Sequence, residues 1–180
     1  MSPEKVLIVY FSRTGRTKIL ARELANKLGC SIEEIKTPVR YSGFFGYQLA
    51  LLQAMFKVLP VLTPLQSKIA DYDLVIMGGP VWGGSICSPL RAFIETYRND
   101  FKNVAFVSTQ SGNVGGKHVF EKMRIAVHRP PLATLNVTER DFRKGSYRNT
   151  ISSFISKLSL SNPKIARRRI AQPSSNEATF

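Results

Sequence analysis

The sequence predicts a doubly wound α/β domain, in which helices cover both faces of a parallel sheet. Two observations predict this class. Apolar runs at Lys5–Phe11, Asp71–Gly79 and Asn103–Thr109 are typical of buried strands, and segments with helical periodicity separate them. Each of these runs is followed by a loop rich in glycine and hydroxyl residues, as at a ligand site on the carboxyl edge of such a sheet.

The remaining elements follow from periodicity and from turn residues. Apolar residues recur at helical spacing between Thr17 and Leu28, and Gly29 suits the end of that helix. The other predicted elements are a weaker strand at Ser31–Lys36, a helix within Gly46–Leu59, helices at Pro89–Arg98 and Lys117–Val127, a strand at Ala133–Thr138 and a helix at Ile151–Leu160.

The domain is predicted to span residues 1–160, and residues 161–180 are predicted to form a basic, flexible tail. The formal net charge is +14, and residues 101–180 carry 14 basic and 4 acidic side chains. This excess favours an anionic partner, either an acidic protein or an anionic membrane surface. The only run of arginines, at 167–169, is too short to indicate nucleic-acid binding.

Cysteine usage and hydropathy indicate a cytoplasmic protein, with peripheral membrane association as the open alternative. The two cysteines, Cys30 and Cys87, have neither disulfide-framework nor metal-ligand spacing, so no metal site is expected. No stretch is long and apolar enough to span a bilayer, and the N-terminus does not resemble a signal peptide.

The first loop, SRTGRT at residues 12–17, has the composition of a phosphate site. Ser12, Thr14 and Thr17 supply hydroxyl groups, Gly15 permits a tight turn, and the helix that follows adds unpaired N–H groups. The Walker A pattern is absent, so a phosphate monoester without magnesium fits better than a nucleoside triphosphate. The alternative is an ordinary helix N-cap, whose hydroxyls satisfy only the helix end.

The second and third loops suit a flat ring. In GGPVWGGSICSP the only tryptophan, Trp82, lies between glycines, so its ring could cover a ligand that the backbone approaches closely. A tryptophan that only closes the turn is the alternative. The third loop, TQSGNVGG, offers polar groups for a ring edge or a polyol chain, and by itself this signal is weak.

Taken in order, the strand–SxTGxT–helix, YDLVIMGGPVWGGSICSPLRAF and VAFVSTQSGNVGG resemble the flavodoxin-like family over residues 4–160. The resemblance implies a five-stranded sheet of order 2-1-3-4-5 and one non-covalently bound FMN. It assigns the FMN phosphate to Ser12, Thr14, Gly15 and Thr17, with backbone amides of Arg13 and Arg16. It assigns the two sides of the isoalloxazine ring to Pro80, Val81, Trp82, Gly83 and Gly84, and to Thr109, Gln110, Ser111, Gly112 and Gly116.

The resemblance implies an FMN-dependent oxidoreductase that passes electrons to a quinone or a similar acceptor. The PVWGG loop is more similar to flavodoxin-like quinone reductases and oxidases than to the small electron carriers, which are typically acidic. A carrier that delivers electrons to a redox protein and a membrane-targeted regulatory module remain alternatives. The long connection at residues 37–70 has three possible roles: packing on the sheet, a homodimer surface, or an apolar contact with a membrane or a quinone.

Overall fold

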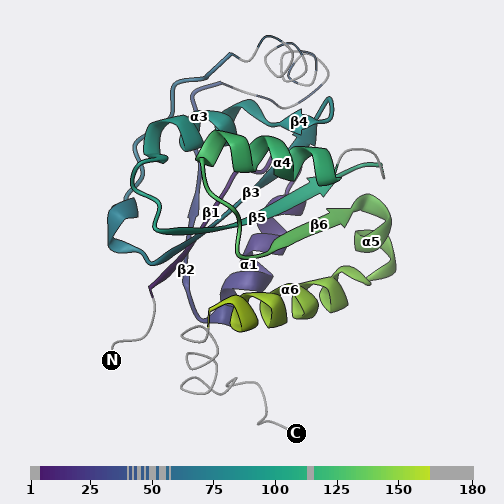
Figure 1. Ribbon diagram of the computed structural model, residues 1–180. Coiled ribbons are helices and arrows are strands. Elements are labelled where there is room, and N and C mark those ends of the chain that lie inside the picture. The colour runs from purple at the N-terminus through teal and green to yellow at the C-terminus, as the bar shows by residue number, and fades with distance from the viewer. Residues whose placement is uncertain are drawn as a thin grey trace, which may run out of the picture.

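The computed structural model describes residues 5–39, 41, 43, 46, 48, 52, 56, 58–112 and 116–162. In spatial order β2-β1-β3-β5-β6, its parallel strands form one sheet (Figure 1). Counted along the chain without the short antiparallel β4, this is the order 2-1-3-4-5, so the predicted fold class is confirmed. The parallel strands are β1 Val6–Tyr10, β2 Ser31–Glu34, β3 Leu74–Trp82, β5 Asn103–Gln110 and β6 Thr134–Thr138.

Two helical layers enclose the sheet, with α1 and α6 on one face and α3 and α4 on the other (Figure 1). Strand β1 shows why both faces are covered. Its side chains alternate between the layers, Leu7 and Val9 toward α3 and α4, and Val6 and Ile8 toward α1 and α6. The helices are α1 Arg16–Leu28, α3 Ser88–Tyr97, α4 Gly116–Val127, α5 Glu139–Lys144 and α6 Tyr147–Ser161, with a 3₁₀ turn, η1, at Ile69–Asp71.

The second predicted loop is a β-hairpin, and this corrects the prediction. Strand β3 continues through Pro80 to Trp82 and pairs with β4, Ser85–Ile86, in antiparallel register. The turn consists of Gly83 and Gly84, whose φ angles are 54° and 68°. A two-residue turn with positive φ at both positions matches the twist of the strands, and glycine adopts it without steric cost.

The chain after β6 contains α5, a helix that was not predicted. Thr138 and Asp141 form a reciprocal capping box: the Thr138 hydroxyl accepts from the Asp141 N–H at 3.2 Å, and the Asp141 carboxylate accepts from the Thr138 N–H at 2.8 Å. The Thr138 hydroxyl, whose Oγ1 also lies 2.6 Å from Asp141 Oδ2, and then the Thr138 N–H hold the pKa of Asp141 below its ordinary value. Gly145 ends α5 with a φ of 69°, and α6 begins at Tyr147, four residues before the predicted start.

Two predictions fall largely outside the described residues: the helix within Gly46–Leu59 and the flexible tail at residues 161–180. Over the ranges that the structure does describe, no helix combines the length and the apolar character needed to cross a membrane.

Candidate functional site

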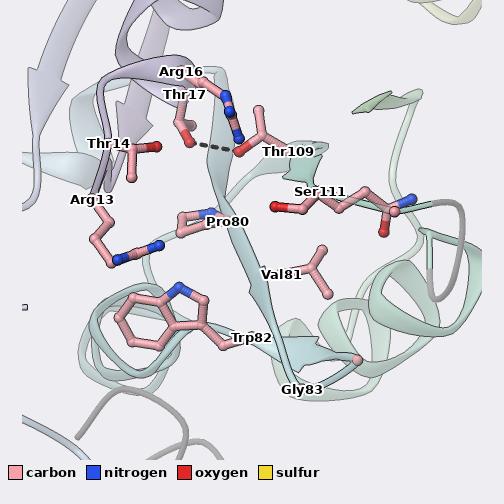
Figure 2. Close-up of a pocket in the computed structure, with 13 residues that line it drawn as sticks. Arg13, Thr14, Arg16, Thr17, Pro80, Val81, Trp82, Gly83, Thr109 and Ser111 are labelled. Carbon is pink, nitrogen blue, oxygen red and sulfur yellow. Dashed lines mark hydrogen bonds between the residues drawn. The ribbon is translucent and has the colours of Figure 1, made fainter. Parts of the chain in front are cut away.

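An open cavity of about 250 Å³ lies at the carboxyl edge of the sheet, beside the ends of β3 and β5 and the start of α1 (Figure 2). All of its lining residues belong to the set that the sequence predicted. Among the described residues, the predicted Ser12 and Gly15 do not line it, and Gly116 begins α4. The lining residues are Arg13, Thr14, Arg16, Thr17, Pro80, Val81, Trp82, Gly83, Gly84, Thr109, Gln110, Ser111 and Gly112.

The turn after β1 is organised by its own polar groups. The Ser12 hydroxyl accepts a hydrogen bond from the Gly15 N–H at 3.1 Å, so Ser12 shapes the turn from outside the cavity. Gly15 has a φ of 89°, and its carbonyl accepts from the Ile19 N–H at 3.0 Å in the first turn of α1. Thr14 and Thr17 line the cavity beside this helix start, where unpaired N–H groups and the helix dipole favour an anion.

A hydroxyl pair joins this turn to the end of β5. The Oγ1 atoms of Thr17 and Thr109 lie 2.8 Å apart, and both residues are buried (Figure 2). The two residues are 92 positions apart in the sequence, so the bond fixes the start of α1 against the centre of the sheet. It also uses one hydrogen-bonding position of each hydroxyl, which leaves the other positions for a ligand.

Cationic side chains from two helices hold the β3–β4 hairpin. From α4, Lys122 Nζ donates to the Gly84 carbonyl at 3.0 Å. From α3, Arg91 Nη2 donates to the Ser85 hydroxyl at 3.1 Å and to the Ile86 carbonyl at 3.3 Å. Burial lowers the pKa of the Arg91 guanidinium from its ordinary value. The glycine turn at the rim of the cavity is therefore positioned by residues that do not themselves line it.

Trp82 is both part of an aromatic cluster and part of the cavity wall. Its ring centroid lies 5.8 Å from that of Phe11 and 5.0 Å from that of Tyr41, and the side chain is buried. Arg13 reaches toward Trp82 and Pro80 from the opposite loop (Figure 2). The cluster fixes the plane of the indole, so the ring is a preformed wall for a flat ligand.

Two buried polar atoms of the lining indicate that a ligand completes the site. Among the described residues, neither Trp82 Nε1 nor Gln110 Oε1 has a hydrogen-bond partner. One is a donor and the other an acceptor, and such buried groups are normally satisfied. FMN carries ring carbonyls and a ring N–H that match these two atoms, and a phosphate that matches the turn at residues 12–17. The residues present therefore fit FMN.

Arginines are the only charged side chains among the described lining residues. Arg16 forms an ion pair with Glu139 at the start of α5, with 2.9 Å between Nη2 and Oε1. In the part of the chain described, no group of three or more His, Cys, Asp and Glu could hold a metal ion. The charge of the site thus suits an anionic ligand, and no carboxylate or histidine of the lining offers general acid or base chemistry.

Several residues that shape the site were not predicted. Arg91, Lys122 and Glu139 act from neighbouring helices, and Phe11 and Tyr41 support Trp82 from behind. The contacts of Lys122 and Glu139 join segments far apart in the sequence, whereas Arg91 reaches Ser85 six residues away. The hairpin itself had a local signal, because a Gly-Gly pair between apolar residues is typical of a two-residue β-turn.

The fold and this edge of the sheet define a flavodoxin-like flavoprotein. The sequence model of the family described as NADPH-dependent FMN reductase matches residues 5–139, three quarters of the chain. The chain therefore belongs to that family. FMN is its cofactor, and the protein is an FMN-dependent oxidoreductase, as the sequence motifs predicted. The contacts of individual residues with FMN stay predictions.

Solved structures show the same fold. A flavoprotein of Lactobacillus acidophilus NCFM in complex with FMN is 21% identical, with 81% of this chain and 99% of that chain covered and a TM-score of 0.63. A protein of Bacteroides eggerthii DSM 20697 described as a flavoprotein is 20% identical, with 84% and 98% covered and a TM-score of 0.67. A flavodoxin of Agrobacterium tumefaciens, described as WrbA-like, is 12% identical, with 94% and 99% covered and a TM-score of 0.56.

Proposed function

We propose that this oxidoreductase takes electrons from NADPH and passes them through FMN to a quinone or a similar small acceptor. NADPH would lose a hydride and become NADP⁺. The quinone would gain two electrons and two protons, one of them from water. The observation that carries the proposal is the cavity in which the hydroxyl-rich turn, the glycine hairpin and the end of β5 meet. Family membership supports NADPH as the donor.

Bound FMN supplies the hydride-accepting and electron-donating chemistry, and the protein supplies binding, orientation and electrostatics. Thr14, Thr17 and the backbone at the start of α1 would hold the phosphate. Trp82 would cover one part of the ring system, and Gln110 would bond its polar edge. Because the described lining residues include no carboxylate or histidine, the second proton would come from solvent.

The charge of the protein supports electron transfer to a small molecule over the electron-carrier role of the acidic flavodoxins. A net charge of +14 is opposite to that of the typical acidic flavodoxins, so this chain lacks the acidic character that such carriers share. Arg13 and Arg16 at the cavity also favour small acceptors that carry negative charge. The alternative is a carrier that delivers electrons to a protein, and an acidic protein partner would then be required.

The test is turnover of the FMN-loaded protein with NADPH, NADH and a panel of quinones, followed by absorbance of the nicotinamide. Steady NADPH consumption that depends on the quinone is expected. Consumption only after a separate reductase is added would support the carrier instead. A protein that takes up no added FMN, measured by flavin fluorescence quenching, would contradict both functions.

A further inference from the structure

Two further cavities continue from the candidate FMN site toward the edge strand β2. The first, of about 380 Å³, shares Arg13 with the FMN cavity and is walled by apolar groups that include Phe11, Ile35 and Tyr41. The second, of about 370 Å³, shares Glu34 and Lys36 with the first. The three cavities therefore adjoin in series through shared lining residues. Only the cavity of about 250 Å³ at the end of β3 is assigned to FMN.

The outermost cavity is lined by three cations. Lys18 and Arg22 lie one turn apart on α1, and Lys36 follows β2. Lys18 forms an ion pair with Glu34, with 3.2 Å between Nζ and Oε2. Among the described residues, the side chains of Arg22 and Lys36 have no ion-pair or hydrogen-bond partner. Two cations are thus available to a ligand.

The carboxylates in the same lining are already engaged. Glu34 accepts from the Tyr10 hydroxyl at 3.2 Å as well as from Lys18. Burial, and then the charge of Glu34, raise the pKa of Tyr10 to about 12, so this hydroxyl stays protonated and keeps donating. Glu33 accepts from the backbone N–H groups of Gln66 and Ser67. With both carboxylates bound to donors, the cavity suits an anion that Arg22 and Lys36 approach.

The separation between the FMN cavity and the outermost cavity matches an elongated ligand with an anionic end. Strand β2 lies two strand positions from β3, which is about 10 Å, because neighbouring strands are ~4.8 Å apart. A dinucleotide can therefore place its redox ring beside FMN and its other nucleoside at the β2 edge. In such ligands a 2′-phosphate on the adenosine ribose distinguishes NADPH from NADH, and arginine is its typical partner.

We infer that Arg22 and Lys36 bind the ribose 2′-phosphate of NADPH. The cavity between them and the FMN site, where Arg13 and Thr37 lie beside the apolar wall, would hold the body of the dinucleotide. The inference rests on the proposed use of NADPH as electron donor. It assigns donor selectivity to the end of the site farthest from the flavin. Arg22 and Lys36 contact only the phosphate, so they are not catalytic residues.

The test compares 2′,5′-ADP with 5′-AMP as probes in calorimetric titrations of the FMN-loaded protein. The variant is Arg22→Gln/Lys36→Gln, and the matched control, Lys27→Gln/Lys157→Gln, removes two exposed cations that do not line the cavities. We expect tighter binding of 2′,5′-ADP than of 5′-AMP. The variant should lower the affinity for 2′,5′-ADP by about tenfold or more and leave the affinity for 5′-AMP unchanged. The control should change neither affinity.

In turnover assays the same variant should lower kcat/KM for NADPH by about tenfold and leave kcat/KM for NADH unchanged. A wild-type protein that binds both probes equally, or a variant that binds 2′,5′-ADP like the control, would overturn the inference. Absence of quinone-dependent NADPH oxidation would contradict the proposed function only. The probe titrations need no turnover, so the two failures are distinguishable.

Discussion

The turn at residues 12–17 and the β3–β4 hairpin line the same cavity, but they are held in place differently. The turn is fixed by its own groups and by the Thr17–Thr109 bond to the central sheet. The hairpin is fixed by Lys122 and Arg91, which reach it from α4 and α3. The phosphate end of the site is therefore coupled to folding stability. The ring end can be adjusted by side chains whose loss leaves the core intact.

The contrast holds for the turn of the hairpin but not for its base, which packs against α3 and where the largest loss of stability is expected. A Cβ added at Gly79 would lie 2.8 Å from Cys87 Sγ and 3.2 Å from Leu90 Cδ2. We expect Gly79→Ala to lower the free energy of unfolding by up to about 3 kcal/mol, because the start of α3 cannot move without disturbing β4. The measurement is chemical denaturation of the apoprotein.

Gly112→Ala is the matched control for that experiment. A Cβ there meets no atom within 4 Å, although Gly112 lines the same cavity. It should change the free energy of unfolding by no more than about 0.5 kcal/mol. Equal losses in the two variants would mean that packing at the hairpin base is not the constraint.

On the phosphate side, Thr17→Val removes a buried hydroxyl and leaves that of Thr109 without its partner. We expect a loss of about 2 kcal/mol in the free energy of unfolding, the usual cost of a buried unsatisfied group. FMN binding should weaken as well, and by more than in Arg13→Ala. Thr134→Val, on an exposed residue of β6, is the control and should alter neither quantity. An unchanged free energy of unfolding in Thr17→Val would show that the hydroxyl at this position does not contribute to folding stability.

On the hairpin side, alkaline pH should lower the free energy of unfolding through the Cys87 thiol. Burial raises the pKa of this thiol to about 12, from an ordinary value near 9. Between these values the unfolded chain releases the proton and the folded chain keeps it, so stability falls as the pH rises. The slope contributed by this thiol approaches about 1.4 kcal/mol per pH unit.

Cys87→Ala should remove that contribution, and urea denaturation between pH 8 and pH 11 measures it. Tyr10, whose pKa is also raised to about 12, should still contribute a decline above pH 10 in the variant. Identical pH profiles for the variant and the wild type would show that the thiol does not keep its proton in the folded state.

The smallest effect concerns Lys122. Lys122→Met removes the bond to the Gly84 carbonyl but keeps most of the side-chain volume. Stability should fall by less than about 1 kcal/mol, because the ammonium is exposed. Amide hydrogen exchange at residues 83–86 should nevertheless become faster than in Lys157→Met, a substitution on the exposed surface of α6. Exchange rates equal to those of the control would indicate that the two-strand ladder alone holds the hairpin.

Local sequence signals predicted a parallel sheet and the loops that line the cavity, and the family resemblance supplied the order of the strands. The apolar strands, the SRTGRT turn and the ordered loops are contiguous features, and the ends of parallel strands must meet at one edge of the sheet. The hairpin and α5 were not predicted, although each had a local signal in the sequence. These signals are the Gly83–Gly84 pair for the hairpin and the capping-box spacing of Thr138 and Asp141 for α5. The Thr17–Thr109 bond and the Lys122 brace could not be predicted, because each depends on tertiary proximity.

The position of β2 at the edge of the sheet determines which part of the protein would unfold first in denaturant. This strand has four residues and is half-exposed, and among the described strands it pairs only with β1. Strands β1, β3 and β5 are buried in the middle of the sheet. Edge elements with few buried contacts open at a lower free energy than the rest of a domain. In moderate urea the cavity beside β2 would be lost while the flavin site persisted. If Arg22 and Lys36 select NADPH as proposed, the protein would then stay yellow after it had lost that selectivity.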